Sequence, residues 1–395
     1  MKPAHLTEYD LLKLDWIQIL KDTIDMRPTS WWLPEHSQYP VKEWKNAKNL
    51  LKRMIRTIDL FAGIGGVRIG FENTGFFRTV FANDFDISCK VTYDLNFNDA
   101  KLTVGDITKI NINDLPEFDF LLGGFPCQAF SIAGYQEGFD DKKGRGNLFF
   151  DVAKIIKERQ QMGFLLENVK NLEKHDGGKT LRIIKDTLKA LGYHVKHKVL
   201  NSMDYGNVPQ TRERIYIVGF KNKIHYDNFE FPKKQLLNIK IGSLLEMSVP
   251  EKYYYSNKAL YPKLKDQIVR TDTIYQWRRV YVRENKNKVC PTLTANMGMG
   301  GHNVPIINDW KGIRKLTPRE CLRFQGYKDT YRLPKNLPDS QLYKQIGNSV
   351  TVPVIEAIAN QIIRAISVQK SSVSINQNIQ FTPKRNEVFD YAKSR

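Results

Sequence analysis

The stretch Asp59-Leu60-Phe61-Ala62-Gly63-Ile64-Gly65-Gly66 joins a short apolar run to a segment with helical periodicity. Glycines at such a strand-to-helix turn let the backbone bend tightly and approach a ligand. Asp84 lies 19 residues after Gly65, where an acidic side chain can bind a ribose diol. A dinucleotide fingerprint would need a third glycine at the position that Arg68 occupies. The turn therefore suits a nucleoside without a pyrophosphate, such as S-adenosylmethionine, and an ordinary tight turn is the alternative.

Outward from this turn, residues 56–220 alternate short apolar runs with helical periods. The predicted strands are 57–61, 79–82, 118–122, 164–166, 195–200 and 215–219. The predicted helices between them are 67–73, 88–95, 148–158 and 180–191. Such alternation predicts an α/β fold with a parallel, doubly wound, Rossmann-like sheet.

The rest of the chain suggests one core domain interrupted by a smaller one. Residues 221–310 are loop-rich, aromatic and basic, and helical patterns return at 317–324 and 352–366. We therefore expect a catalytic and cofactor-binding domain at 55–220, an inserted domain at 221–310 and a completing segment at 311–370. Residues 1–54 form an extension of unknown role and 371–395 a polar tail.

Composition narrows the class of protein. The 395 residues carry 61 Lys and Arg against 42 Asp and Glu, a formal net charge of +19, and 41% are apolar. These values predict a folded chain that binds an acidic partner. Nucleic acid is the favoured partner, ahead of an anionic membrane surface. Four scattered cysteines predict neither a disulfide framework nor a zinc site, so no metal is expected. No stretch suits a signal peptide or a membrane span, and a cytoplasmic location fits.

A single cysteine occupies a suggestive position. Cys127 lies in Gly123-Gly124-Phe125-Pro126-Cys127-Gln128, directly after a predicted strand, and a glycine-rich, charged stretch follows at 134–146. Ligands bind at the carboxyl edge of open α/β sheets, and such a stretch can form a lid. Cys127 is a candidate nucleophile if its pKa is lowered, whereas an inert buried cysteine is the alternative.

Two further motifs follow predicted strand ends. Glu167-Asn168-Val169 offers a carboxylate at the same sheet edge, or simply a cap for the next helix. Gln210-Thr211-Arg212-Glu213-Arg214 places two arginines at positions i and i+2, so that both could reach one ligand, or lie on a solvated edge strand.

In this order the motifs resemble those of the C5-cytosine DNA methyltransferase family, of the bacterial restriction-modification type. The resemblance runs from 57 to about 366. Six blocks match: 61–66, 124–128, 167–169, 210–214, Arg314-Lys315-Leu316-Thr317-Pro318-Arg319-Glu320 and Gly347-Asn348-Ser349-Val350. It implies a sheet that binds S-adenosylmethionine and a smaller, loop-rich target-recognition domain.

The resemblance also implies catalytic roles. Cys127 would add to C6 of a cytosine and so make C5 nucleophilic toward the methyl group of S-adenosylmethionine. Glu167 would hold the N3 edge and favour its protonation. Arg212 and Arg214 would face the O2 side, Arg214 more directly. No residue of the sequence stands out as the base that removes the C5 proton, and bound water is the expectation.

For the cofactor, the resemblance implies a pocket lined by Phe61 and the following glycines, with Asp84 on the ribose, Phe85 stacked on adenine and Asp106 accepting from the adenine amine. The complete expected set is Phe61, Gly63, Gly65, Gly66, Asp84, Phe85, Asp106, Pro126, Asn348, Ser349 and Val350. The family more often has glutamate at position 84 and tryptophan at position 85, so we expect an altered cofactor affinity.

The implied substrate is double-stranded DNA, with the cytosine flipped out of the helix because C6 is inaccessible inside a duplex. Gln128 and a lid at 129–147 would close over it. Region 221–310 would read the sequence, and the segment Pro291–Asn296 resembles recognition regions for GCNGC. The residues expected to contact DNA are Gln128, Gln276, Trp277, Arg278, Arg279 and Thr292. A functionally linked restriction endonuclease and a monomeric state are further expectations.

Two alternatives stay open at this point. One is the tRNA cytosine-5 methyltransferase branch, which shares the catalytic blocks but carries a smaller insert and a different motif after its Pro-Cys. The other is a catalytically silent DNA-binding regulator on the same scaffold, although all the named catalytic positions are filled.

Overall fold

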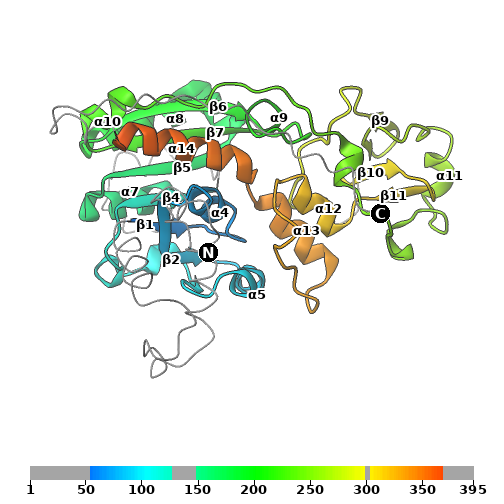
Figure 1. The fold of residues 1–395 in the computed structure, drawn as a ribbon, viewed down its shortest axis with the longest axis horizontal. Coiled ribbons are helices and arrows are strands. Elements are labelled where there is room, and N and C mark those ends of the chain that lie inside the picture. Colours follow the sequence, from blue (N-terminus) through cyan, green and yellow to red (C-terminus); the bar gives the residue numbers. More distant parts are fainter. Residues whose placement is uncertain (1–53, 127–147, 299–302, 368–395) are drawn as a thin grey trace, which may run out of the picture.

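The computed structural model describes residues 54–126, 148–298 and 303–367. Their main feature is a seven-stranded sheet with the strand order β3-β2-β1-β4-β5-β7-β6 (Figure 1). The strands are β1 (Ile55–Leu60), β2 (Phe77–Asp84), β3 (Leu102–Val104), β4 (Phe120–Gly123), β5 (Gly163–Val169), β6 (His194–Asn201) and β7 (Glu213–Phe220). Every strand of the sequence-based prediction is present, with shifted ends, and β3 is an additional three-residue strand.

The sequence predicted a parallel sheet, but one strand of the observed sheet runs antiparallel to its neighbours. The strands from β3 to β5 pair in parallel, whereas β7 runs antiparallel to both β5 and β6. Only residues 202–212, with the short helix α9 (Ser202–Tyr205), connect β6 to β7. A parallel connection needs a crossover of about a dozen residues or more, so this one returns antiparallel. As a result, the amino end of β7 lies at the carboxyl edge of its parallel neighbours.

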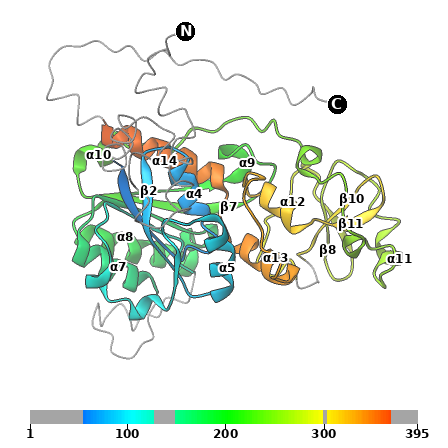
Figure 2. The same ribbon diagram turned by 60° about the horizontal axis from the view of Figure 1, so that its bottom comes forward.

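Helices cover both faces of this sheet (Figure 2). On one face lie α4 (Gly66–Glu72), α10 (Lys223–Asn228) and α14 (Val352–Ser367), whose apolar side chains share a core with β4 and β7. On the other face lie α7 (Leu148–Arg159) and α8 (Lys179–Ala190). Helix α5 (Ile87–Asn96) packs near β2 and β3. A three-layer α/β arrangement results, and β5 carries the continuous apolar run expected of a strand buried on both faces.

The C-terminal part of the chain completes this core. A methyl group at Gly70 of α4 would lie 2.6 Å from Cβ of Ile355 in α14, so the two helices are in close contact. The segment Asp339–Ser367, comprising α13 (Asp339–Asn348) and α14, is long and apolar enough to span a membrane by length and composition alone. Because α14 buries Val354, Ile355 and Ile358 against the sheet and α4, it is a core helix here.

A second, antiparallel sheet lies at the far end of the molecule (Figure 1). Its order is β11-β10-β8-β9, with β8 (Tyr275–Trp277), β9 (Val282–Glu284), β10 (Pro305–Asn308) and β11 (Ile313–Lys315). The small helix α11 (Tyr261–Leu264) packs beside it, and α12 (Pro318–Arg323) and α13 lie between the two sheets. The domain boundary predicted at residue 310 lies between β10 and β11.

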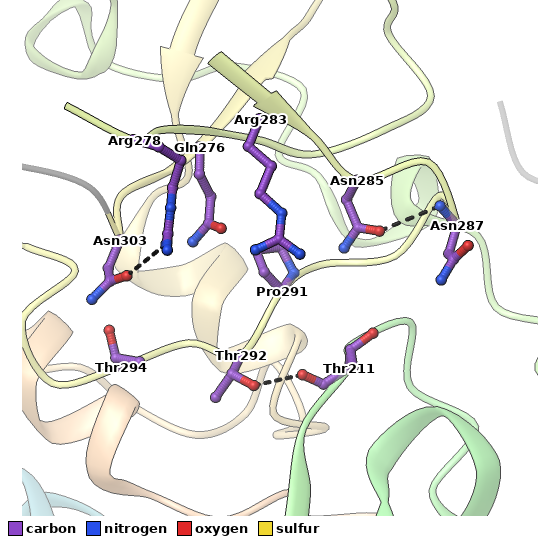
Figure 3. A pocket seen from close by; sticks show the side chains of 10 residues that line it. All are labelled: Thr211, Gln276, Arg278, Arg283, Asn285, Asn287, Pro291, Thr292, Thr294 and Asn303. Atoms are coloured by element: carbon purple, nitrogen blue, oxygen red, sulfur yellow. Dashed lines mark hydrogen bonds between the residues drawn. The ribbon is translucent and has the colours of Figure 1, made fainter. Parts of the chain in front are cut away.

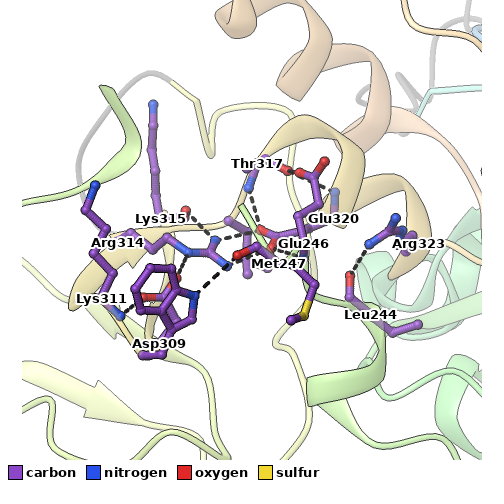
Figure 4. A network of polar contacts seen from close by, with 12 residues as sticks. Leu244, Glu246, Met247, Asp309, Lys311, Arg314, Lys315, Thr317, Glu320 and Arg323 are labelled. Carbon is purple, nitrogen blue, oxygen red and sulfur yellow. Dashed lines mark hydrogen bonds and ion pairs between the residues drawn. The ribbon is translucent and has the colours of Figure 1, made fainter. Parts of the chain in front are cut away.

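A buried ion network fixes β11 to α12 (Figure 4). Arg314 donates to the two carboxylate oxygens of Glu320 at 2.8 and 2.7 Å, and both side chains are fully buried. Glu320 also accepts from the backbone N–H groups of Thr317 at 2.8 Å and Glu246 at 2.9 Å, and Asp309 forms an ion pair with Arg314. Thr317 and Glu320 form a capping box that begins α12. The block 314–320 therefore joins the second sheet, through β11, to α12.

Candidate functional site

The glycine turn between β1 and α4 forms one wall of the site. Gly63 and Gly65 adopt φ angles of 54° and 80°, which glycine tolerates at no steric cost, and Phe61 adopts the same left-handed region at 57°, where a side chain is strained. The N–H of Gly63 donates to the carboxylate of Asp84 at 2.8 Å, and Asp86 N–H donates to the other oxygen, also at 2.8 Å. Burial raises the pKa of Asp84. The end of β2 thus holds the turn open at the carboxyl edge of the sheet.

The C-terminal block closes against the same turn. A methyl group at Gly66 would lie 2.6 Å from Oη of Tyr327 and 2.7 Å from Oγ of Ser349, so only glycine fits. Those two oxygens are hydrogen-bonded at 2.6 Å, and Tyr331 donates to the carbonyl of Ile64 at 2.7 Å. Ser349 and Val350 are buried at this contact, whereas Asn348 is exposed at the end of α13.

Two other predicted cofactor residues lie where a ligand could reach them. Phe85 follows β2 directly, and 78% of its surface is exposed. Asp106 is half-buried and caps a 3₁₀ turn by accepting from the N–H of Thr108 at 3.0 Å, which lowers the pKa of Asp106. The exposed ring beyond the glycine turn is free to stack on a flat ligand.

The loop after β4 contacts the end of β5. Asn168 donates from Nδ2 to the carbonyl of Phe125 at 2.9 Å, and a methyl group at Gly124 would lie 3.5 Å from Oε2 of Glu167. Pro126 is exposed at the last described position of this loop. Cys127, Gln128 and the predicted lid lie outside the described residues. The backbone that leads to Cys127 is therefore fixed beside Glu167.

Glu167 pairs with the nearer arginine of the predicted pair. Because β5 and β7 are antiparallel, Val169 lies opposite Arg214, and Nε of Arg214 is 3.1 Å from Oε1 of Glu167. Burial raises the pKa of Glu167, and the charges of Arg214 and Arg212 oppose that shift. The pair places a carboxyl group with an increased proton affinity next to a fixed cation.

Arg212 precedes β7 and is nearly completely buried. It donates to the carbonyl oxygens of Leu293 at 2.7 Å, Gly347 at 3.1 Å and Ser349 at 2.5 Å. Burial and the charge of Arg214 lower the pKa of Arg212. The three carbonyl oxygens have the opposite effect, because they accept hydrogen bonds from the charged guanidinium. Its Nε has no hydrogen-bond partner within the described ranges. Arg212 thus ties the motif at 210–214 to the 290s and to the C-terminal block.

A polar pocket of about 340 Å³ opens where the second sheet meets the 210–214 motif (Figure 3). It is lined by Thr211, Gln276, Arg278, Arg283, Asn285, Asn287, Pro291, Thr292, Thr294 and Asn303. Three predicted DNA-contacting residues, Gln276, Arg278 and Thr292, are in this lining. Trp277 packs instead on the core of the second sheet, and Arg279 is exposed at the turn between β8 and β9 with a φ angle of 72°.

Comparison with known proteins settles the family. The model of the C-5 cytosine-specific DNA methylase family matches residues 55–364. The chain belongs to this family. It is therefore an S-adenosylmethionine-dependent DNA (cytosine-5-)-methyltransferase of the Type II restriction-modification kind.

Bacterial Type II methyltransferases are among the curated relatives of this methyltransferase. It is 51% identical to the Type II methyltransferase M.Bsp6I of Bacillus sp. (strain RFL6) over 317 residues, 79% of this chain and 100% of the relative. It is 39% identical to M.HhaI of Haemophilus parahaemolyticus over 323 residues, 78% of this chain and 94% of the relative. Among solved structures, Spodoptera frugiperda DNMT2 superposes with a TM-score of 0.61 at 21% identity, covering 78% of this chain and 99% of that one, and thus shares the fold.

The cofactor pocket of the methyltransferase fits S-adenosylmethionine. Asp59, two residues before Phe61, is fully buried, and neither of its carboxylate oxygens has a hydrogen-bond partner among the described residues. Burial raises its pKa to about 8. The charge of the buried Arg68 opposes this shift, so a cation of the protein itself acts on Asp59 beneath the glycine turn. The exposed Phe85 and the glycine turn suit the adenosine of S-adenosylmethionine.

Sequence reasoning assigned no role to several residues that shape this site. Asn168, Tyr327 and Tyr331 position the loops, and Asp59 lies in the quoted glycine stretch without an assigned task. The only signals were that Asn168 belongs to the matching block 167–169 and that Asp59 belongs to the quoted glycine stretch. The contact between Tyr331 and Ile64 joins residues 267 positions apart, which no local pattern predicts. The other cysteines, Cys89, Cys290 and Cys321, are buried, and burial raises the pKa of their thiols.

Proposed function

We propose that this methyltransferase transfers a methyl group to C5 of a cytosine flipped out of a short, specific duplex site, and that the mark protects host DNA from a cognate restriction endonuclease. The observation that carries the proposal is the Glu167–Arg214 pair, 3.1 Å apart and next to Gly124 in the loop that leads to Cys127. These groups share one sheet edge with the glycine turn, so a base and a methyl donor can meet there.

Each group has a proposed task. The thiolate of Cys127 adds to C6, and Glu167 holds a proton at N3 so that negative charge does not build up on the ring. The raised pKa of Glu167 supports this task. Arg214 fixes Glu167 and faces O2. Arg212, which the resemblance places on the same side, donates to three backbone carbonyls, and we assign it a positioning role. S-adenosylmethionine supplies an electrophilic methyl group, held by the cofactor residues from Phe61 to Val350 named above. Water then accepts the C5 proton, the thiolate of Cys127 leaves C6, and the N3 proton returns to Glu167.

Base flipping costs a few kcal/mol, which contacts to the pocket and the phosphates offset. We assign recognition of the DNA sequence to region 221–310 together with β11. We propose GCNGC as the recognised sequence, because the segment Pro291–Asn296 resembles recognition regions for it. The pocket beside this segment offers amides, hydroxyls and guanidinium groups, which are suited to base edges. We further propose that the chain acts as a monomer in the cytoplasm.

Bisulfite sequencing tests this function. Plasmid DNA from cells that express the wild type should retain unconverted cytosines at one short motif, and DNA from cells expressing Cys127→Ser should not. Equal conversion everywhere would contradict the proposal and favour the DNA-binding regulator. A parallel methyl-transfer assay that offers tRNA beside unmethylated duplex DNA distinguishes a DNA methyltransferase from the tRNA cytosine-5 methyltransferase branch. The identities of 39–51% to Type II enzymes favour DNA as the substrate.

A further inference from the structure

The recognition pocket contains one guanidinium group whose position and partners set it apart. Gln276 of β8 and Arg283 of β9 are directly opposed in the antiparallel ladder, so their side chains lie on the same face. Figure 3 shows both side chains directed into the pocket, with Arg283 pointing toward Pro291 between Gln276 and Asn285. The hairpin therefore presents an amide and a guanidinium together.

The donors of Arg283 are available. Neither a hydrogen bond nor an ion pair joins Arg283 to any other described residue, and the pocket lining includes no carboxylate. By contrast, Arg278 in the same pocket lies 3.4 Å from Oδ1 of Asn303, and the nearby Arg270 is paired with Asp272 at 2.9 Å. An exposed arginine in a pocket without a counter-charge is suited to an external acceptor.

The surroundings of Arg283 favour a base edge over a phosphate. A guanidinium donates two parallel hydrogen bonds, and O6 and N7 of guanine are the matching pair of acceptors in the major groove. Around Arg283 lie Gln276, Asn285 and Asn303, whose side-chain amides can pair with base edges. The pocket is also tied to the active site, since Thr292 donates to the carbonyl of Thr211 at 2.6 Å and Leu293 accepts from Arg212 at 2.7 Å.

We propose that Arg283 is a specificity-determining residue that reads one guanine of the target site through O6 and N7. This inference rests on the proposed function, because it requires a duplex DNA substrate. It assigns to Arg283 a task that the motifs of the sequence did not indicate.

The test combines removal of the N7 acceptor from single guanines of the DNA with substitution of Arg283, and measures binding for each combination. The methylated motif of the wild type is first mapped, and duplexes are made in which one guanine at a time becomes 7-deazaguanine, which lacks N7. Binding of the full chain to each duplex is measured by fluorescence anisotropy. The wild type should lose about tenfold in affinity at one guanine, and Arg283→Gln should bind the normal and modified duplexes equally at that position alone.

Two further variants serve as controls, one for the charge of Arg283 and one for its position in the pocket. Arg283→Lys keeps the charge but not the paired donors, so it should also lose the discrimination while keeping the salt dependence of binding. Arg270→Gln removes an arginine of the same region that does not line the pocket, and it should discriminate like the wild type. Full discrimination by Arg283→Gln, or an equal loss on all duplexes, would overturn the inference. Failure of the wild type to methylate any duplex would instead overturn the proposed function.

Discussion

Asp59, buried beneath the glycine turn, is the residue whose ionisation makes stability depend on pH. The unfolded chain loses this proton above about pH 4, whereas the folded chain keeps it up to about pH 8. The folded state therefore binds more protons in this window, and the free energy of unfolding falls as pH rises through it. Asp59→Asn stays neutral at every pH. In urea unfolding without cofactor, the free energy of unfolding of Asp59→Asn minus that of the wild type should increase from pH 5 to pH 8. A difference that stays constant would contradict the raised pKa of Asp59.

Glu167 gives the sharpest catalytic prediction at this scale. Glu167→Gln keeps the shape but cannot hold a transferable proton, so single-turnover methyl transfer should slow by roughly 10²–10⁴-fold. Because the pKa of Glu167 is raised, the protonated form extends to higher pH, and the rate should decline as pH rises through that pKa. Binding of S-adenosylmethionine should be unchanged. Glu158→Gln, an exposed carboxylate on α7, is the control, and an unimpaired Glu167→Gln would refute the role.

The residues that could be predicted from the sequence are those whose position follows from a strand end. Asp84 and Glu167 end strands of one sheet, so their common edge follows from topology, and the structure places both there. Arg283 could not be singled out, because exposed arginines occur throughout this basic chain and only the fold places this one in a pocket lined without a carboxylate. The strand direction of β7 also had to come from the structure, since it depends on a short connection.

At the scale of elements, the buried network between β11 and α12 predicts a large effect on stability. Removing one partner of a buried ion pair leaves an uncompensated charge, so Arg314→Met should lower the free energy of unfolding by about 3–5 kcal/mol. The pair between the half-buried Arg323 and the exposed Asp329, 2.8 Å apart at the surface, is the control. Arg323→Met should cost about 0–1 kcal/mol. Denaturant unfolding followed by circular dichroism measures both, and equal losses would contradict the network's role.

Elements of regular length were predictable, and the shortest ones were not. The runs of β5 and the helix α8 have clear periodicity, whereas β3 and the strands of the second sheet span three or four residues. Strands this short contain too few alternating residues to be distinguished from loops. Their pairing depends on distant contacts such as the one between Tyr254 and Arg314.

At the scale of the whole molecule, the net charge of +19 has an expected measurable consequence. Each phosphate contact releases counterions, so the logarithm of the DNA-binding constant should fall linearly with the logarithm of salt concentration, by about 0.9 per contact. Anisotropy titrations on specific and unrelated duplexes between 50 and 200 mM salt, a range of about fourfold, measure this slope. Affinity that does not change with salt would contradict a cationic DNA cleft.

The central claim is that Cys127 attacks a cytosine whose C5 then takes the methyl group, and covalent trapping tests it most directly. In a duplex with 5-fluorocytosine at the target position, fluorine replaces the proton that must leave, so the thiol cannot be eliminated after methyl transfer. The full chain with S-adenosylmethionine should form an adduct that survives denaturing electrophoresis, and Cys127→Ala should form none. Absence of an adduct with the wild type, or an equal adduct with Cys127→Ala, would contradict the account.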